Sequence, residues 1–173
     1  THLVLKNVTF GRDGQPATLV AKMVDIGVSS RQLTDPLHMD TITLFDGTLN
    51  LSPQTAPLPF RADRLLLNNM AFNSPNTAWD LSAQKVTGGV RPWDPEAGNV
   101  LGKKANIQIS AGSLTLNGVP ASNVLIEGEL TDKEVVLTTI GADMARGSLT
   151  GTARRDANGG WKVPPMLITR ITD

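Results

Sequence analysis

Few side chains in the sequence could support acid–base or metal chemistry. The two histidines are His2 and His38, whereas a zinc site usually needs several convergent His, Cys or carboxylate ligands. His2 lies at the start of the chain and His38 lies in a connector that contains Pro36, so we interpret both as solvated surface side chains. Glu127 and Glu129 share one face of an expected strand, and we interpret that face as a solvated outer face rather than a catalytic carboxylate pair.

The sequence offers no motif for nucleophilic or phosphate chemistry. Cysteine is absent, which excludes a disulfide framework, a thiolate zinc site and a cysteine nucleophile. GxSxG, P-loop and GxGxxG motifs are also absent. We interpret Gly88-Gly89 and Gly159-Gly160 as turn glycines rather than phosphate cradles. We therefore expect no enzyme: no catalytic residues, no metal and no cofactor.

Charge and hydropathy exclude two classes of partner. The 173 residues carry 16 basic and 16 acidic side chains, and a neutral chain lacks the basic patch that nucleic acids need. The basic pairs Lys103-Lys104 and Arg154-Arg155 are too short for a polybasic membrane-binding patch. No apolar run approaches the roughly 20 residues of a membrane helix. We expect any membrane attachment to come only from a segment absent from this chain.

Alternation of apolar and polar residues predicts strands along almost the whole chain. Leu3, Leu5 and Asn7 are expected on one face of the first strand, and Val8 and Phe10 on the other. Ser29–Leu33 is the expected short helical turn, with Ser29 as its N-cap. The Asn117-Gly118 pair predicts a tight hairpin. Asp46-Gly47 fits either a hairpin turn or a bulge within one long strand, and the three tryptophans are expected in the core: Trp79, Trp93 and Trp161.

These patterns predict an all-β fold. We expect an elongated, twisted antiparallel sheet of repeated strand units, curled into a groove or flattened barrel, with one or two short helical turns. The alternative is a β-sandwich with Greek-key connections. Periodicity alone does not separate an open groove from a closed core, because both give the same alternation.

An internal repeat gives the fold its expected organisation. The segment 3–10 matches 65–72, and Gly-Thr-Leu-Asn-Leu at 47–51 matches Gly-Ser-Leu-Thr-Leu at 112–116, with a weaker copy at 147–151. We predict one β-rich segment over 1–173, with repeats at about 3–51 and 65–116 and a partial third copy at about 124–171. Stacked units of this kind bury their apolar faces only against their neighbours.

The chain also resembles a known family. The alternating run 21–28, the connector around Leu33 and the run 39–51, which ends in Gly-x-Leu-x-Leu, resemble the N-terminal region of AsmA-like proteins. The resemblance implies a periplasmic protein of Gram-negative bacteria, anchored in the inner membrane by one N-terminal helix. It also implies a β-groove with an apolar interior that moves phospholipid, and it brings no catalytic motif.

Two functions follow as expectations. The first is a non-enzymatic envelope segment whose apolar groove handles or conducts phospholipid, or another acyl-chain ligand, between the inner and outer membranes. The alternative is a structural or assembly module that binds periplasmic or outer-membrane proteins by edge-strand pairing. Each CH₂ removed from water gains about 0.8 kcal/mol, so an acyl-chain site needs a continuous apolar stripe. We predict that this stripe is formed by Leu49, Leu51, Ile107, Ile109, Leu114, Leu116, Val124 and Ile126.

Overall fold

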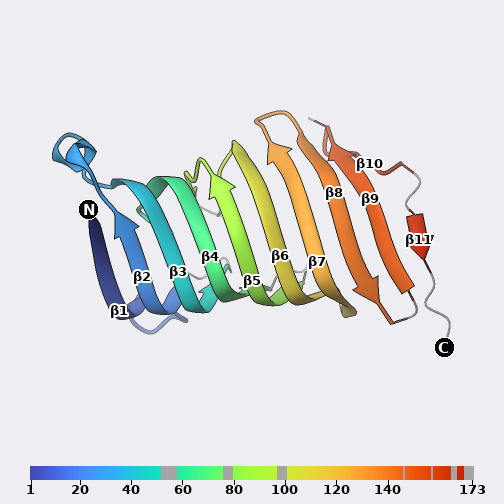
Figure 1. The fold of residues 1–173 in the computed structure, drawn as a ribbon, viewed down its shortest axis with the longest axis horizontal. Coiled ribbons are helices and arrows are strands. Elements are labelled where there is room, and N and C mark those ends of the chain that lie inside the picture. The colour runs from blue at the N-terminus through green and yellow to red at the C-terminus, as the bar shows by residue number, and fades with distance from the viewer. Residues whose placement is uncertain are drawn as a thin grey trace.

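The strands form one sheet that is not closed into a barrel. The computed structural model describes residues 1–51, 58–75, 80–96, 101–145, 147–156, 158–164 and 167–169. Within these ranges the sheet has eleven strands: β1 to β10 are neighbours in chain order, and β11 pairs with β9 (Figure 1). The predicted all-β sheet, curled into a groove, is confirmed. The sandwich alternative is wrong, because the strands are not divided between two packed sheets.

The strands are long, and the helical content of the described residues is one short turn. The turn η1 (Ser30–Leu33) begins at the predicted N-cap, where the Ser29 hydroxyl accepts from the Arg31 amide. The strands are β1 (His2–Phe10), β2 (Leu19–Gly27), β3 (His38–Asn50), β4 (Arg61–Ser74), β5 (Leu81–Arg91), β6 (Ala105–Leu116), β7 (Val119–Leu130), β8 (Val135–Met144), β9 (Gly147–Arg155), β10 (Trp161–Lys162) and β11 (Leu167–Thr169).

One pair of neighbours departs from the predicted antiparallel pattern. β3 and β4 are parallel, so both strands start at the same end of the sheet and the chain must return there after β3. The sheet therefore consists of two three-stranded antiparallel units, β1–β3 and β4–β6, which are joined in parallel and followed by antiparallel β7–β9. At the described end of the connection, Leu58 and Phe60 pack against the buried cluster.

The two stronger sequence repeats coincide with these three-stranded units. The matched segments 3–10 and 65–72 lie in β1 and β4, while 47–51 and 112–116 lie at the ends of β3 and β6. The third segment, 147–151, lies in β9, which runs antiparallel to β3 and β6. The division of the chain into repeats stays a prediction.

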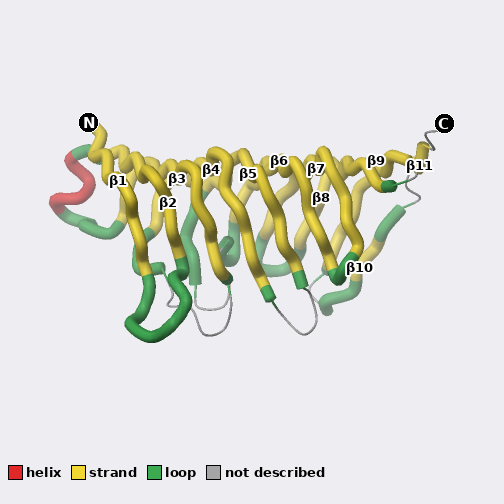
Figure 2. Tube along the Cα trace, turned by 90° about the horizontal axis from the view of Figure 1, so that it is seen from below, coloured by secondary structure: helices red, strands yellow, loops and turns green. Residues whose placement is uncertain are grey.

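A line of left-handed residues crosses the sheet and bends it. Five residues inside strands have φ between 49° and 54°, and all five are exposed. Single left-handed residues act as bulges that bend a strand and exchange its side-chain faces. Figure 2 shows the result: one part of the sheet is seen edge-on along the top, and the other part runs downward. We call these residues the bend line: Asn7, Asp46, Asn69, Lys85 and Asn123.

The bend line settles two expectations. Asp46 and Gly47 lie inside the single strand β3, so the bulge is confirmed and the hairpin is wrong. In β1, Leu5 lies opposite Val24, while Val8 lies opposite Ala21, and both partners are buried. The strict alternation predicted for β1 is therefore wrong beyond Asn7, because the left-handed residue returns Val8 to the face that carries Leu5.

The bend gathers the apolar side chains on one face of the sheet, which we call the inner face. Leu67, Met70 and Val86 are at most 3% exposed there. Directly opposite residues of neighbouring strands share a face, so the register produces apolar rows that cross the sheet. One such row is Leu5, Val24, Leu44, Leu67, Gly88, Ile109, Ile126 and Ile140.

Two further sequence expectations are corrected by the strands. Gly88 and Gly89 lie inside β5 and are not turn glycines. A Cβ at Gly88 would stand 2.1 Å from the carbonyl oxygen of Gln108 in β6, so the glycine permits a close approach of the two backbones. Trp93 is buried as predicted, whereas Trp161 is 45% exposed and is not core. Trp79 lies outside the described residues.

Candidate apolar binding groove

The structure places all eight predicted groove residues on the inner face. Ile109 lies directly opposite Ile126. Leu49 lies between Leu19 and Phe72. The remaining residues also lie on this face. Four of them face inner-face residues of the neighbouring strand: Val124 faces Ala111, Ile107 faces Val90, Leu114 faces Ala83 and Leu116 faces Leu81. Leu51 packs against the buried apolar cluster.

The eight residues divide by exposure. Leu49 is 1% exposed and Val124 is 6% exposed, so both are closed off by neighbouring side chains. The other six are only half-buried: Leu51, Ile107, Ile109, Leu114, Leu116 and Ile126. The predicted stripe is therefore partly filled core and partly accessible apolar surface.

The inner face becomes accessible toward both ends of the sheet. In β1, Leu3 and Leu5 lie opposite Ile26 and Val24 but are 53% and 47% exposed. In β8, Leu137 and Ile140 continue the inner rows and are half-buried. We did not predict these positions as lining residues, although the same alternation of apolar residues marks them in the sequence.

Phe60 and Trp93, two described residues outside the strands, cover part of the inner face. The Phe60 ring meets the Phe10 ring edge-on, with centroids 5.9 Å apart. Trp93 continues the ladder beyond β5: it exchanges two 2.9 Å backbone hydrogen bonds with Ala62 and is 3% exposed. Sequence reasoning missed the roles of Phe10 and Phe60, because nothing local links residues so far apart in the chain.

A cavity of about 710 Å³ lies at the β8–β9 end of the sheet. Leu137, Ala153, Val163 and Pro164 contribute to its lining. The volume falls within the range of about 300–1,000 Å³ that small-molecule sites occupy. Space for a small ligand therefore exists at this end of the inner face.

The sequence comparison identifies the family. Over 171 residues, which are 99% of this chain, the sequence is 69% identical to the AsmA family protein YicH of Escherichia coli strain K12. The predicted AsmA-like assignment, close to YicH, is confirmed. The matched region is 30% of that protein's length, so the chain spans about a third of its relative. No family model and no solved structure matches the chain.

A charged network fixes the start of β3 and β4 in this AsmA-like chain. Arg31 donates to the Asp63 carboxylate at 2.6 Å, and Arg61 donates to both oxygens of Asp35 at 2.9 Å. His38 lies between Asp63 and Asp35, at 2.8 Å and 3.3 Å. Its side chain is 27% exposed, so the expectation of a solvated His38 is wrong.

The network shifts the ionisation of its members without forming a metal site. The hydrogen bond from Arg31 lowers the pKa of the Asp63 carboxyl, and a second hydrogen bond from His38 lowers it further. The same bond raises the pKa of the Arg31 guanidinium. The described residues contain no group of three or more His, Cys, Asp or Glu placed to hold a metal ion. We interpret the network as a structural tie between η1, β3 and β4.

The outer face of the AsmA-like chain is polar where the inner face is apolar. Glu127 accepts a 3.2 Å hydrogen bond from Gln108 on the neighbouring strand, and His2 contacts Asp25 at 2.6 Å with its side chain 62% exposed. None of the described helices is long and apolar enough to cross a membrane. The apolar inner face is therefore the surface that could hold an apolar ligand.

Proposed function

We propose that this chain is one stretch of an apolar groove that holds the acyl chains of phospholipid in the cell envelope. The observation that carries the proposal is the set of apolar rows running from β1 to β9 across an unclosed sheet. Neighbouring strands are about 4.8 Å apart, so nine strands span roughly 40 Å. That length exceeds the hydrocarbon core of a bilayer, about 30 Å.

The chemistry of the inner face suits this ligand. Acyl chains gain free energy from non-directional contact, at about 0.8 kcal/mol for each buried CH₂, and they need no polar anchor. The accessible residues Leu3, Leu5 and Ile126 offer such contact, while the buried Leu49 and Val124 support the wall beneath. A groove of this kind needs no catalytic group, and we propose a non-enzymatic role.

The family supports an envelope setting for the groove. The match to an AsmA family protein favours a periplasmic location for this chain. We propose that a segment of the protein outside this chain holds it at the inner membrane. Phospholipid would then pass along the inner face between the inner and outer membranes.

Native mass spectrometry after gentle purification tests the proposal. We expect phospholipid masses on the wild-type chain and their loss from Leu116→Asp, which adds a charge to a half-buried inner position. Ser113→Asp is the matched control, because Ser113 lies on the same strand but is exposed on the outer face. A folded wild-type chain without lipid, or equal loss in both variants, would contradict the proposal.

A second function has an observation of its own. Among the described strands β1 pairs only with β2, and Leu3, Val4 and Leu5 are about half exposed, so a free edge could accept a strand from another protein. A photoreactive residue at Val4 tests this assembly function. Cross-links to a discrete envelope protein would support it, whereas cross-links to lipid alone would count against it.

A further inference from the structure

The outer face carries a depression, lined by both polar and apolar side chains, that the groove does not use. Its volume is about 680 Å³, and its lining comes mainly from β4, β5 and β6. Gly89 lies at the centre of this patch, because the register places it between Leu66 of β4 and Gln108 of β6. Gly89 has no side chain to fill this face of β5, which leaves the hollow between its neighbours.

Two arginines stand side by side at one edge of the depression. The β4–β5 ladder pairs Leu65 with Val90 and continues to Ala62 and Trp93, so Arg64 lies directly opposite Arg91. Both side chains are exposed and both line the depression. Like charges directly opposite on neighbouring strands are destabilising.

No acidic side chain relieves this repulsion within the part of the chain that the structure describes. None of the ion pairs there includes Arg64 or Arg91. The register neighbour of Arg64 on β3 is Thr41, and that of Arg91 on β6 is Asn106. Both neighbours are uncharged, so the pair presents concentrated positive charge beside an open hollow.

The lining also includes neutral hydrogen-bonding side chains. Asn68, Thr87, Asn106 and Gln108 are exposed and surround the depression. We propose that Arg64 and Arg91 bind an oxyanion, a phosphate group in the first instance, in the hollow above Gly89. Arginine forks bind phosphate through paired, charge-assisted hydrogen bonds, and a bound anion would remove the repulsion between the two guanidinium groups.

The depression lies on the opposite face of the sheet from the groove, so this inference does not rest on the proposed function. Phosphate could arrive as a free ion, as a small phosphate ester or as a lipid headgroup. The shared chemistry is the phosphate oxyanion, and the three sources are the arms of one experiment: inorganic phosphate, glycerol 3-phosphate, and vesicles of phosphatidylcholine with and without phosphatidylglycerol.

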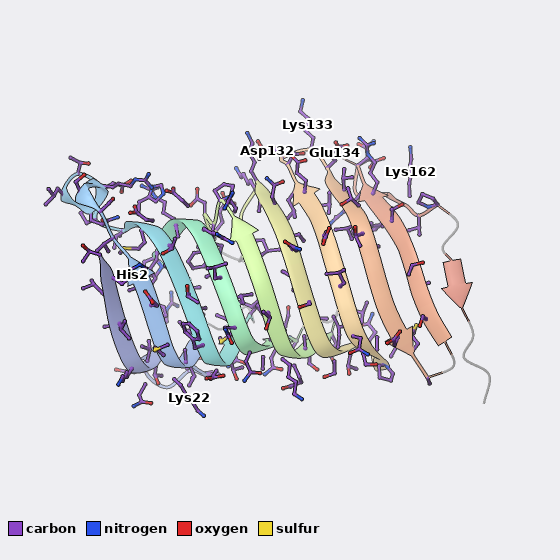
Figure 3. The ribbon with its side chains drawn as sticks, viewed as in Figure 1. His2, Lys22, Asp132, Lys133, Glu134 and Lys162 are labelled. Carbon is purple, nitrogen blue, oxygen red and sulfur yellow. The ribbon has the colours of Figure 1, made fainter. Side chains whose placement is uncertain are left out.

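Binding is measured by amide shifts in ¹H–¹⁵N NMR spectra and by vesicle co-sedimentation. The test variant is Arg64→Gln with Arg91→Gln. The control is Lys22→Gln with Lys133→Gln, which removes the same charge at exposed sites in β2 and in the β7–β8 turn, at the bottom and top of the view in Figure 3. We expect at least one probe to bind and to shift the amides of Gly88, Gly89 and Gln108. Each lost arginine should weaken binding by about tenfold, while the control binds as the wild type does.

Each outcome has a definite reading. Binding of the small phosphates assigns the site to free phosphate groups, and binding of phosphatidylglycerol vesicles alone assigns it to headgroups; both support the proposal. Absence of binding by all probes, or equal weakening in the test and control variants, overturns it. Folding of the test variant is verified by its thermal melt, and a slightly raised melting temperature is expected without ligand because the like-charge repulsion is gone.

Discussion

Asp46 of β3 accepts a 2.8 Å hydrogen bond from the side-chain amide of Asn69 in β4, and both residues have left-handed backbones, with φ of 54° and 52°. They lie side by side at the parallel join between the two three-stranded units. Most L-residues pay about 1–2 kcal/mol in this conformation, whereas Asn and Asp adopt it more readily. The bend of the sheet therefore depends on residue type at positions that bury nothing.

Replacement of Asn69 should separate the two contributions of this position. Asn69→Ala loses the hydrogen bond and keeps the strained backbone, so we expect a loss of roughly 2 kcal/mol in the free energy of unfolding. Asn69→Gly loses the hydrogen bond but tolerates positive φ, so its loss should be smaller, about 1 kcal/mol. Urea denaturation measures both. If the Asn69→Ala chain is as stable as the wild type, the bend does not depend on a residue that tolerates positive φ at this position.

Gly47 allows β2 and β3 to approach at the bend. A Cβ at this position would stand 1.8 Å from the carbonyl oxygen of Val20 and 2.6 Å from the Cα of Ala21. Gly47→Ala should therefore destabilise the chain by more than about 3 kcal/mol, since the obstacle is backbone. Gly141→Ala is the control, because its new Cβ would meet nothing closer than 4.0 Å. Thermal melts that place both variants near the wild type would refute the close approach.

The pH dependence of stability follows from the Arg31–Asp63 contact. Arg31 lowers the pKa of the Asp63 carboxyl, so folding favours the ionised form. This contribution is fully present above the ordinary Asp pKa, about 3.9, and is lost as the pH falls through the lowered value. We expect Asp63→Asn to be less stable than the wild type at pH 7, with the difference vanishing in strong acid. If the stability difference between the wild type and Asp63→Asn does not change with pH, the charge of Asp63 does not contribute to it.

The fold class, the tight hairpin and many inner-face residues could be predicted from the sequence because each depends on local pattern, whereas Asp46-Gly47 fitted a hairpin and a bulge equally. Asn117 and Gly118 both have positive φ in the β6–β7 hairpin, as the Asn-Gly pair predicts. The alternation of Ala105, Ile107 and Ile109 predicts the inner face of β6 correctly, because Ala105 is buried and Ile107 lies opposite the buried Val90.

Positions beyond the bend line could not be predicted in the same way. A left-handed residue occupies one position of the alternation, so Val8 shares the face of Leu5. The two positions are three apart, and strict alternation would place them on opposite faces. In four of the five described strands of the bend line the local mark of this shift is an Asn or Asp, whereas in β5 the residue is Lys85. The parallel join of β3 to β4 and the contact of Phe10 with Phe60 are set by tertiary packing and leave no local signal.

Exposure along the inner face predicts opposite effects for two similar substitutions. Leu49 is 1% exposed, so Leu49→Asp buries an unpaired carboxylate, which costs about 4 kcal/mol or more and should abolish the cooperative melt. Leu116 is half-buried, so Leu116→Asp should melt within a few degrees of the wild type. Circular dichroism melts compare them. Loss of folding in both would make Leu116 ordinary core and remove it from the groove.

The central claim is that lipid acyl chains lie along the inner face, and site-specific photo-cross-linking in cells tests it most directly. Photoreactive residues are placed one at a time at Leu116 and Ile126 on the inner face, and at Ser113 and Glu129 on the outer face, within the full-length protein. The account predicts cross-linked phospholipid from the two inner positions and little from the outer pair. Phospholipid captured equally from both faces, or from neither while the protein is folded, would contradict it.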